Sequence, residues 1–145
     1  MSLKYLNIYN NLIKLTRNKK LYENLGEQER FSHRLNFLLF HIGFLLNIYK
    51  NQISKDEKQR LFDFIIIQIE LSIREIGYGD VSVNKNMKNY INHFYSIVDK
   101  IESWESSNID KKKEIIAVYV SRTQNLSFYV DYFEKYRVFL LKNTL

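Results

Sequence analysis

Cysteine and proline are both absent from this chain of 145 residues, which also contains only four glycines. Without cysteine, the protein has no disulfide, no thiolate nucleophile and no thiolate ligand for a metal ion. Without proline, no residue stops a helix by removing a backbone donor. So few turn-forming residues argue against an architecture of many short strands. These absences together favour long helices.

Long hydrophobic runs are missing as well. The most apolar segment, residues 35–49, is shorter than the ~20 residues that a transmembrane helix needs, and it contains Asn36, His41 and Asn47. The N-terminus lacks the apolar core and cleavage site of a signal peptide, and it is not rich in arginine and serine like a transit peptide. We therefore expect no transmembrane segment and a cytoplasmic protein, with peripheral association at the inner face of the cytoplasmic membrane left open.

Acidic residues are in the minority. The chain has 22 Lys and Arg against 16 Asp and Glu, which gives a net charge of +6 and a pI near 9.4. A basic balance suits partners such as nucleic acid, anionic lipid or acidic protein. No basic cluster exceeds three residues, so a solvated helical surface is the simpler interpretation. The many Lys, Asn, Ile, Tyr and Phe residues also resemble the bias of an AT-rich genome.

Apolar residues recur at helical spacing through most of the chain. The strongest pattern runs from Phe31 to Tyr49. Residues 54–57 have the form of a capping box with acids in the first turn, which predicts the start of the next helix. Part of that helix, residues 65–73, alternates in a way that also suits a strand, but the capping box and continuous register favour a helix. The other expected helices span about 3–16, a short turn near 21–26, a helix from Asp80 or Ser82 to about 101, one from Asn108 or Asp110, and one from about 126.

We predict one all-α domain of about six helices, residues 1–145, because no repeat or low-complexity linker divides the chain. A chain of this length can bury roughly 68–70% of its unfolded surface, so a hydrophobic core is expected. The predicted inward residues of the last two long helices are Met87, Tyr90, Ile91, Phe94, Val98 and Ile101, then Leu126, Val130, Phe133 and Leu140.

Candidates for catalysis and metal binding are few. Glu29 and His33 have the four-residue spacing of a helical metal pair, but no third ligand accompanies them. His41 lies within an apolar helix pattern, which is more typical of a hydrogen-bonded core histidine than of a base. The third histidine is His93, and residues 77–79 lack the strand and third glycine of a dinucleotide site. We expect no enzyme, no cofactor and no metal site, and therefore a binding role.

The stretch around residues 74–92 stands out as a candidate binding surface. Gly77 is placed to end one helix in the left-handed conformation. Two lysines follow in the first two turns of the next helix, where positive charge opposes the helix dipole at a cost of about 0.3–1 kcal/mol. A local rule broken without evident gain often marks a functional surface; the alternative is that these lysines are solvated and bind nothing. The predicted partner-binding residues are Arg74, Gly77, Tyr78, Gly79, Asp80, Lys85, Lys88 and Asn92.

The last expected helix carries a second line of apolar residues, outside the face predicted to point inward. It consists of Phe128, Tyr132 and Phe139. Exposed aromatic residues at this spacing can form a groove for a partner or a contact with a membrane. We favour the other interpretation, in which the last helix is central and packed on two sides.

The loop at residues 74–88 carries a family resemblance. Its run from Arg74 to Val83, with Lys85–Lys88 and Phe94-Tyr95, resembles the central signature of the ubiquinol–cytochrome c chaperone family. The resemblance covers about residues 19–125, and Ile76 and Tyr78 depart mildly from the family pattern. Weaker similarity to the same family occurs at Leu21-Tyr22, Leu25-Gly26, Arg30-Phe31, Leu39–His41 and Arg122–Asn125.

The resemblance implies an all-helical assembly factor that is not an enzyme. Mitochondrial members help newly made cytochrome b enter the ubiquinol–cytochrome c reductase complex, with a small partner protein and near the ribosome. This chain looks like a short bacterial member, for which cytochrome b or other reductase subunits are the implied partners. Contact with the ribosome and involvement of haem stay open. From the residues alone, the alternative function is a basic helical module that binds RNA or the ribosome.

Overall fold

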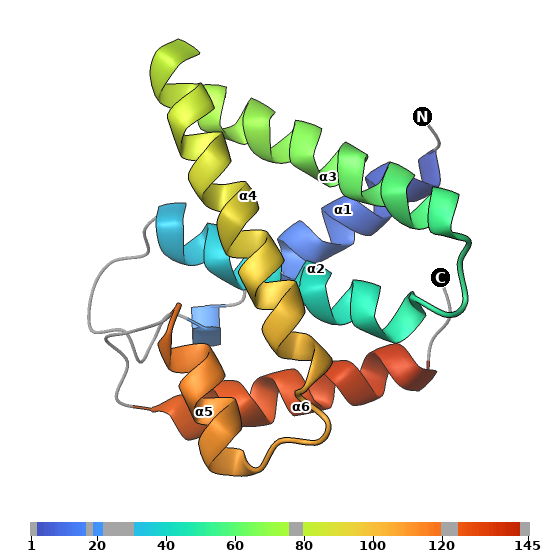
Figure 1. Cartoon of the computed structure of the whole chain (residues 1–145), viewed down its shortest axis with the longest axis vertical. Helices are drawn as coiled ribbons and strands as arrows, with labels where there is room; N and C mark the ends of the chain where they lie inside the picture. Colours follow the sequence, from blue (N-terminus) through green and yellow to red (C-terminus); the bar gives the residue numbers. More distant parts are fainter. Residues whose placement is uncertain (1–2, 17–18, 22–30, 76–79, 120–124, 143–145) are drawn as a thin grey trace.

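A computed structural model describes residues 3–16, 19–21, 31–75, 80–119 and 125–142 (Figure 1). Within these ranges there are helices and no strands. The prediction of an all-α fold is therefore confirmed, and the strand alternative for residues 65–73 is wrong. The elements are α1 (Leu3–Thr16), the 3-10 turn η1 (Lys19–Leu21), α2 (Phe31–Tyr49), α3 (Lys55–Glu75), α4 (Asp80–Glu102), α5 (Ile109–Ala117) and α6 (Leu126–Lys142).

Three helices begin with a side-chain oxygen that caps the first turn. Ser54, Asn108 and Asn125 each accept a hydrogen bond from the backbone N–H three residues later, at 3.1, 2.8 and 3.2 Å. These caps satisfy amide groups that have no partner within the helix. The predicted capping role of Ser54 is confirmed, and Asn108 rather than Asp110 caps α5. Ser82 lies inside α4, which begins at Asp80, so Ser82 does not start that helix.

Helix α2 occupies the centre of the molecule, where α4 crosses it and α1 and α6 pack against other sides (Figure 1). From Leu35 to Tyr49 most of its side chains are buried, including Phe37, Leu39 and Phe40. A helix that is apolar on all sides must be covered on all sides. None of the helices described is long and apolar enough to cross a membrane.

Helices α2 and α4 approach each other closely at Gly43. A Cβ atom built on this glycine would lie 2.8 Å from Ile101 Cδ1 and 3.4 Å from Ile97 Cγ2. Glycine therefore allows the two helices to pack more closely than a larger residue would. The apolar face predicted for α4 is confirmed, with Ile97 as an additional buried member. Its buried predicted residues are Met87, Phe94 and Ile101, and its half-buried ones are Tyr90, Ile91 and Val98.

Helix α6 is held to α2 by hydrogen bonds from tyrosines. The Tyr132 hydroxyl lies 2.7 Å from His41 Nε2, and the Tyr136 hydroxyl donates to the His41 carbonyl at 3.2 Å. In the opposite direction, the Tyr49 hydroxyl of α2 donates to the Leu140 carbonyl at 3.0 Å. These bonds satisfy polar groups that would otherwise be costly to bury.

The core face of α6 is wider than the spacing of aliphatic residues predicts. Three of the four residues predicted inward are buried, and Leu126 is half-buried. The prediction missed Tyr129 and Tyr136, which are also buried. Each places its hydroxyl on a backbone carbonyl, Tyr129 on that of Leu21, so its ring can enter the core with its polar end satisfied.

The aromatic row predicted on α6 does not form one surface. Phe128 is half-buried with its ring against Tyr129, and Tyr132 is half-buried with its hydroxyl on His41. Phe139 is 57% exposed. The interpretation of a central helix packed on two sides is therefore wrong at the C-terminal end of α6, and α2 takes the central position instead.

The single tryptophan joins α4, α5 and α6. The Trp104 Nε1–H donates to Glu134 Oε1 at 2.9 Å, and the Lys112 ammonium pairs with the same oxygen. This ammonium also lies 5.5 Å from the centre of the indole ring, while Phe44 meets the ring edge to face at 5.1 Å. Because Trp104 is buried and unique, its fluorescence reports on the packing of this corner.

Replacing Gly43 tests the close contact between α2 and α4. We expect Gly43→Val to lower the free energy of unfolding by about 2 kcal/mol, because its added methyl groups overpack the contact with Ile97 and Ile101. Gly43→Ala should cost less, since Ile101 Cδ1 is the end of a side chain and alanine gains up to about 1 kcal/mol of helix propensity. Urea unfolding followed by Trp104 fluorescence measures both. A valine variant as stable as the unchanged protein would contradict the close approach.

Candidate functional site

Those predicted binding residues that the structure describes lie in the last turn of α3 and within residues 80–92 of α4. These two parts meet at one end of the molecule, away from α5 and α6 (Figure 1). Arg74 lies in the last turn of α3, and Asp80 begins α4. Lys85, Lys88 and Asn92 follow on α4, and all three are exposed. The remaining predicted residues of the loop, Gly77, Tyr78 and Gly79, lie outside the described residues, as does the predicted helix cap at Gly77.

A hollow of about 390 Å³ opens between the two helices near this end. The predicted residues Lys88 and Asn92 line one wall, while Arg74 and Lys85 do not line it. Sequence reasoning missed the apolar members and the α3 wall, although Ile66, Glu70 and Arg74 follow one another at a spacing of four residues on that helix. We name this hollow, with Arg74 and Lys85 beside it, the tip surface; the residues lining it are Ile66, Glu70, Met87, Lys88, Ile91 and Asn92.

The charges of the tip surface are mixed rather than uniformly positive. Arg74 pairs with Glu70 one turn earlier, with an N···O distance of 3.1 Å. The two side chains are 43% and 39% exposed, so the pair contributes little to stability. It does offset the charge of Arg74, which leaves Lys85 and Lys88 as the main positive groups. The positive charge of the predicted binding surface therefore comes mainly from lysines on α4.

Two apolar side chains on α3 are exposed in the same half of the helix. Ile67 is 48% exposed and Leu71 is 49% exposed. They lie one turn apart and therefore on one face of the helix. Single exposed apolar residues are common in proteins, so exposure alone does not mark these two as a binding site. Their position beside the tip surface is the reason to consider them. A partner that contacts this end of the molecule would meet apolar and charged groups together.

His41 has the surroundings of a structural residue rather than of a catalytic one. It is fully buried, and its Nδ1 lies 2.6 Å from the Phe37 carbonyl oxygen. Nδ1 is therefore assigned the proton, and Nε2 accepts from the Tyr132 hydroxyl. Burial lowers the pKa of His41 to about 4, although the Phe37 carbonyl opposes this change. The interpretation as a core histidine is confirmed. The described residues contain no group of three His, Asp or Glu side chains placed to hold a metal ion.

The sequence matches the model of one known protein family. A family model described as ubiquinol–cytochrome C chaperone matches residues 23–117. The chain belongs to the ubiquinol–cytochrome c chaperone family. The matched range contains α2, α3, α4 and α5, and with them the whole tip surface. Searches of curated proteins and of solved structures each found no significant match.

Membership of the chaperone family confirms the resemblance carried by the segment at residues 74–88. It also shows which parts of this chain stand outside the family match. Helix α1 precedes the matched range and α6 follows it. In this member α6 nevertheless completes the core, because Phe133 and Tyr136 are buried against the matched part of the chain.

The pKa of His41 predicts how stability changes with pH. Between pH 6.5 and 4 the unfolded chain binds a proton on this histidine and the folded chain does not, so stability falls as pH falls. From pH 7 to 5 we expect a loss of about 2 kcal/mol, at up to about 1.4 kcal/mol per pH unit. Chemical unfolding at several pH values measures this loss. The slope should be much smaller in His41→Gln; equal slopes would contradict the assignment.

Proposed function

We propose that this protein is a non-enzymatic assembly chaperone of the ubiquinol–cytochrome c reductase complex that binds cytochrome b or a related subunit. The observation that carries the proposal is the family match over residues 23–117. The family description names a ubiquinol–cytochrome c chaperone, and the identity of the bound subunit is the step that we add. Association at the membrane face would follow from the location of such a client.

The tip surface, with the loop residues Gly77–Asp80, is the proposed docking site. Its composition suits protein binding, because the apolar side chains of Ile66, Met87 and Ile91 are bordered by polar ones. Protein interfaces commonly have such an apolar centre and polar rim. Lys85 and Lys88 would contribute electrostatic attraction to an acidic part of the client and would set its orientation.

Exposed apolar side chains next to the tip surface support a role in shielding a client. A subunit that has not yet joined its complex exposes apolar surface that is later buried. Ile67 and Leu71 provide a matching apolar contact on α3. Burial of apolar area would supply the affinity, while the lysines on α4 would supply selectivity.

A double charge reversal tests the docking site. We expect Lys85→Glu with Lys88→Glu to abolish co-purification of cytochrome b from the native host in mild detergent. Both side chains are exposed, so the thermal unfolding temperature should change little. Mass spectrometry of the captured proteins gives the readout.

The matched control is the pair Lys135→Glu with Lys142→Glu on α6. Both lysines are exposed, the change in net charge is the same, and α6 lies outside the family match. The control should still capture cytochrome b. Capture that survives the double reversal on α4 would contradict the proposed site. Capture of ribosomal proteins and RNA by the unchanged protein, without reductase subunits, would replace the proposed function with the RNA-binding alternative.

A further inference from the structure

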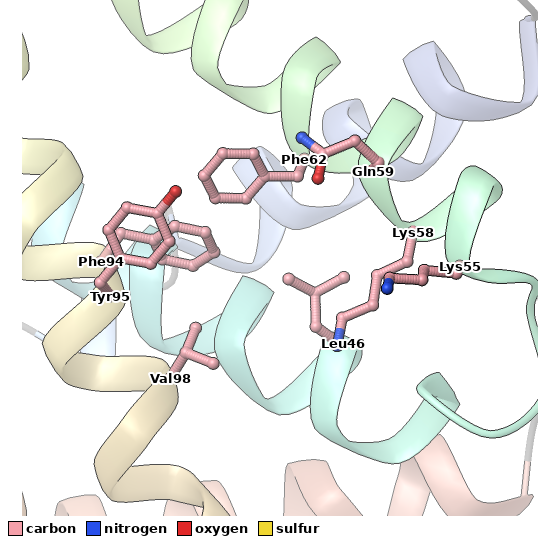
Figure 2. Close-up of a pocket in the computed structure, with 8 residues that line it drawn as sticks. All are labelled: Leu46, Lys55, Lys58, Gln59, Phe62, Phe94, Tyr95 and Val98. Atoms are coloured by element: carbon pink, nitrogen blue, oxygen red, sulfur yellow. The ribbon is translucent and has the colours of Figure 1, made fainter.

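A second hollow, separate from the tip surface, lies where α3 and α4 have diverged and α2 forms the floor between them (Figure 2). Its volume is about 300 Å³, which is near the lower end of the range for ligand sites. It shares no lining residue with the tip surface. We name it the lysine groove; it is lined by Leu46, Lys55, Lys58, Gln59, Phe62, Phe94, Tyr95 and Val98.

The first two turns of α3 form one wall of the lysine groove. Lys55, Lys58, Gln59 and Phe62 follow the spacing of a single helix face, and Figure 2 shows them along the same side of the opening. The acidic residues of this turn, at positions 56–57, do not line the groove. The wall is therefore basic at the start of α3, at Lys55 and Lys58, and apolar two turns later, at Phe62.

The aromatic side chains Phe94 and Tyr95 of α4 lie on the opposite wall, where Phe62 of α3 stacks against them. Phe62 stacks on Phe94 with ring centres 5.4 Å apart and on Tyr95 with ring centres 5.7 Å apart. Phe94 is buried, but Tyr95 is 58% exposed. Stacking holds the Tyr95 ring in place, which lowers the entropy that binding would cost. Tyrosines in such positions often supply a large share of binding energy at protein interfaces.

Lys55 and Lys58 place two positive charges on the lysine groove, although Asp56 and Glu57 lie in the same turn of α3. No ion pair joins Lys55 or Lys58 to a described acidic side chain. Both lysines also lie at the N-terminal end of α3, where the helix dipole adds further positive potential. A carboxylate placed between them would gain from both sources.

We propose that the lysine groove binds a short acidic segment of a partner protein. One or two apolar or aromatic side chains of that segment would enter between Tyr95 and Leu46, and a flanking carboxylate would pair with Lys55 and Lys58. The inference goes beyond the proposed function, because it adds a separate peptide site whose occupant is recognised by its acidic and apolar chemistry.

The shape and content of the groove favour a peptide over other polyanions. Single-stranded nucleic acid is bound through several exposed aromatic rings along a basic track, whereas here only Tyr95 among the lining aromatic side chains is exposed. A membrane surface meets convex faces with inserted apolar side chains, whereas this site is hollowed and lined by Leu46 and Val98. A side chain from a protein segment fits such a hollow.

Selection from a random peptide display library against the full chain tests the inference. We expect the enriched peptides to carry leucine or aromatic residues flanked by aspartate or glutamate. The affinity of one labelled enriched peptide, measured by fluorescence anisotropy, should fall at least ~10-fold in Lys55→Glu with Lys58→Glu, and also in Tyr95→Ala. Higher salt should weaken the binding of the unchanged protein.

The matched control is Lys85→Glu with Lys88→Glu, which makes the same change in net charge at the tip surface. It should leave peptide affinity unchanged, so failure of one site is distinguishable from failure of the other. Tyr95→Ala retains all charges and carries the test if the double reversal disturbs folding, which Trp104 fluorescence reports. Enriched peptides without acidic residues, or affinity that neither groove variant lowers, would overturn the inference. Binding of polyuridylate or of anionic phospholipid vesicles that is lost in the groove variants, with no such loss for peptides, would overturn it as well.

Discussion

The burial of α2 is the constraint on which the rest of this structure depends. Its side chains are apolar around almost the whole circumference, so its stability requires cover from several directions. Gly43 allows α4 to approach on one side, and tyrosine hydroxyls from α6 satisfy His41 on another. The imidazole of His41 stays neutral there because burial lowers its pKa to about 4. His41 is therefore buried in the core in its uncharged form.

The placement of α3 and α4 around α2 creates both candidate binding surfaces. The two helices meet at one end and diverge from it (Figure 1). A side chain of α2, that of Leu46, enters the lining only where they have diverged. Near the junction the walls come from α3 and α4 alone, which gives the tip surface with its mixed charges. Where the helices have separated, Leu46 of α2 lies beneath the opening and the lysine groove results. Both surfaces lie within the part of the chain that matches the chaperone family.

The two surfaces have the composition of protein-binding surfaces. Each combines an apolar interior with a few charged groups at its edge, which is the general anatomy of a protein interface. The histidine with a strongly shifted pKa lies in the core and lines neither hollow. A chaperone must hold a client and later release it, and surfaces of modest size with exposed lysines suit such reversible contacts.

The sequence by itself determined the helices, the cap at Ser54, the buried role of His41 and the family. These depend on local spacing, on side-chain capping chemistry and on a run of adjacent residues. The sequence left Asn108 and Asp110 as alternatives for the start of α5, and the structure decided for Asn108. Only the tertiary structure decided which helix is central. Aliphatic spacing on α6 did not reveal that Tyr129 and Tyr136 are buried, because a tyrosine can be buried only where its hydroxyl finds a carbonyl on another element. The convergence of Lys55 with Tyr95, which lie on different helices, was likewise decided in three dimensions. Periodicity shows which face a residue occupies on its own helix, whereas a binding surface depends on which faces of different helices meet.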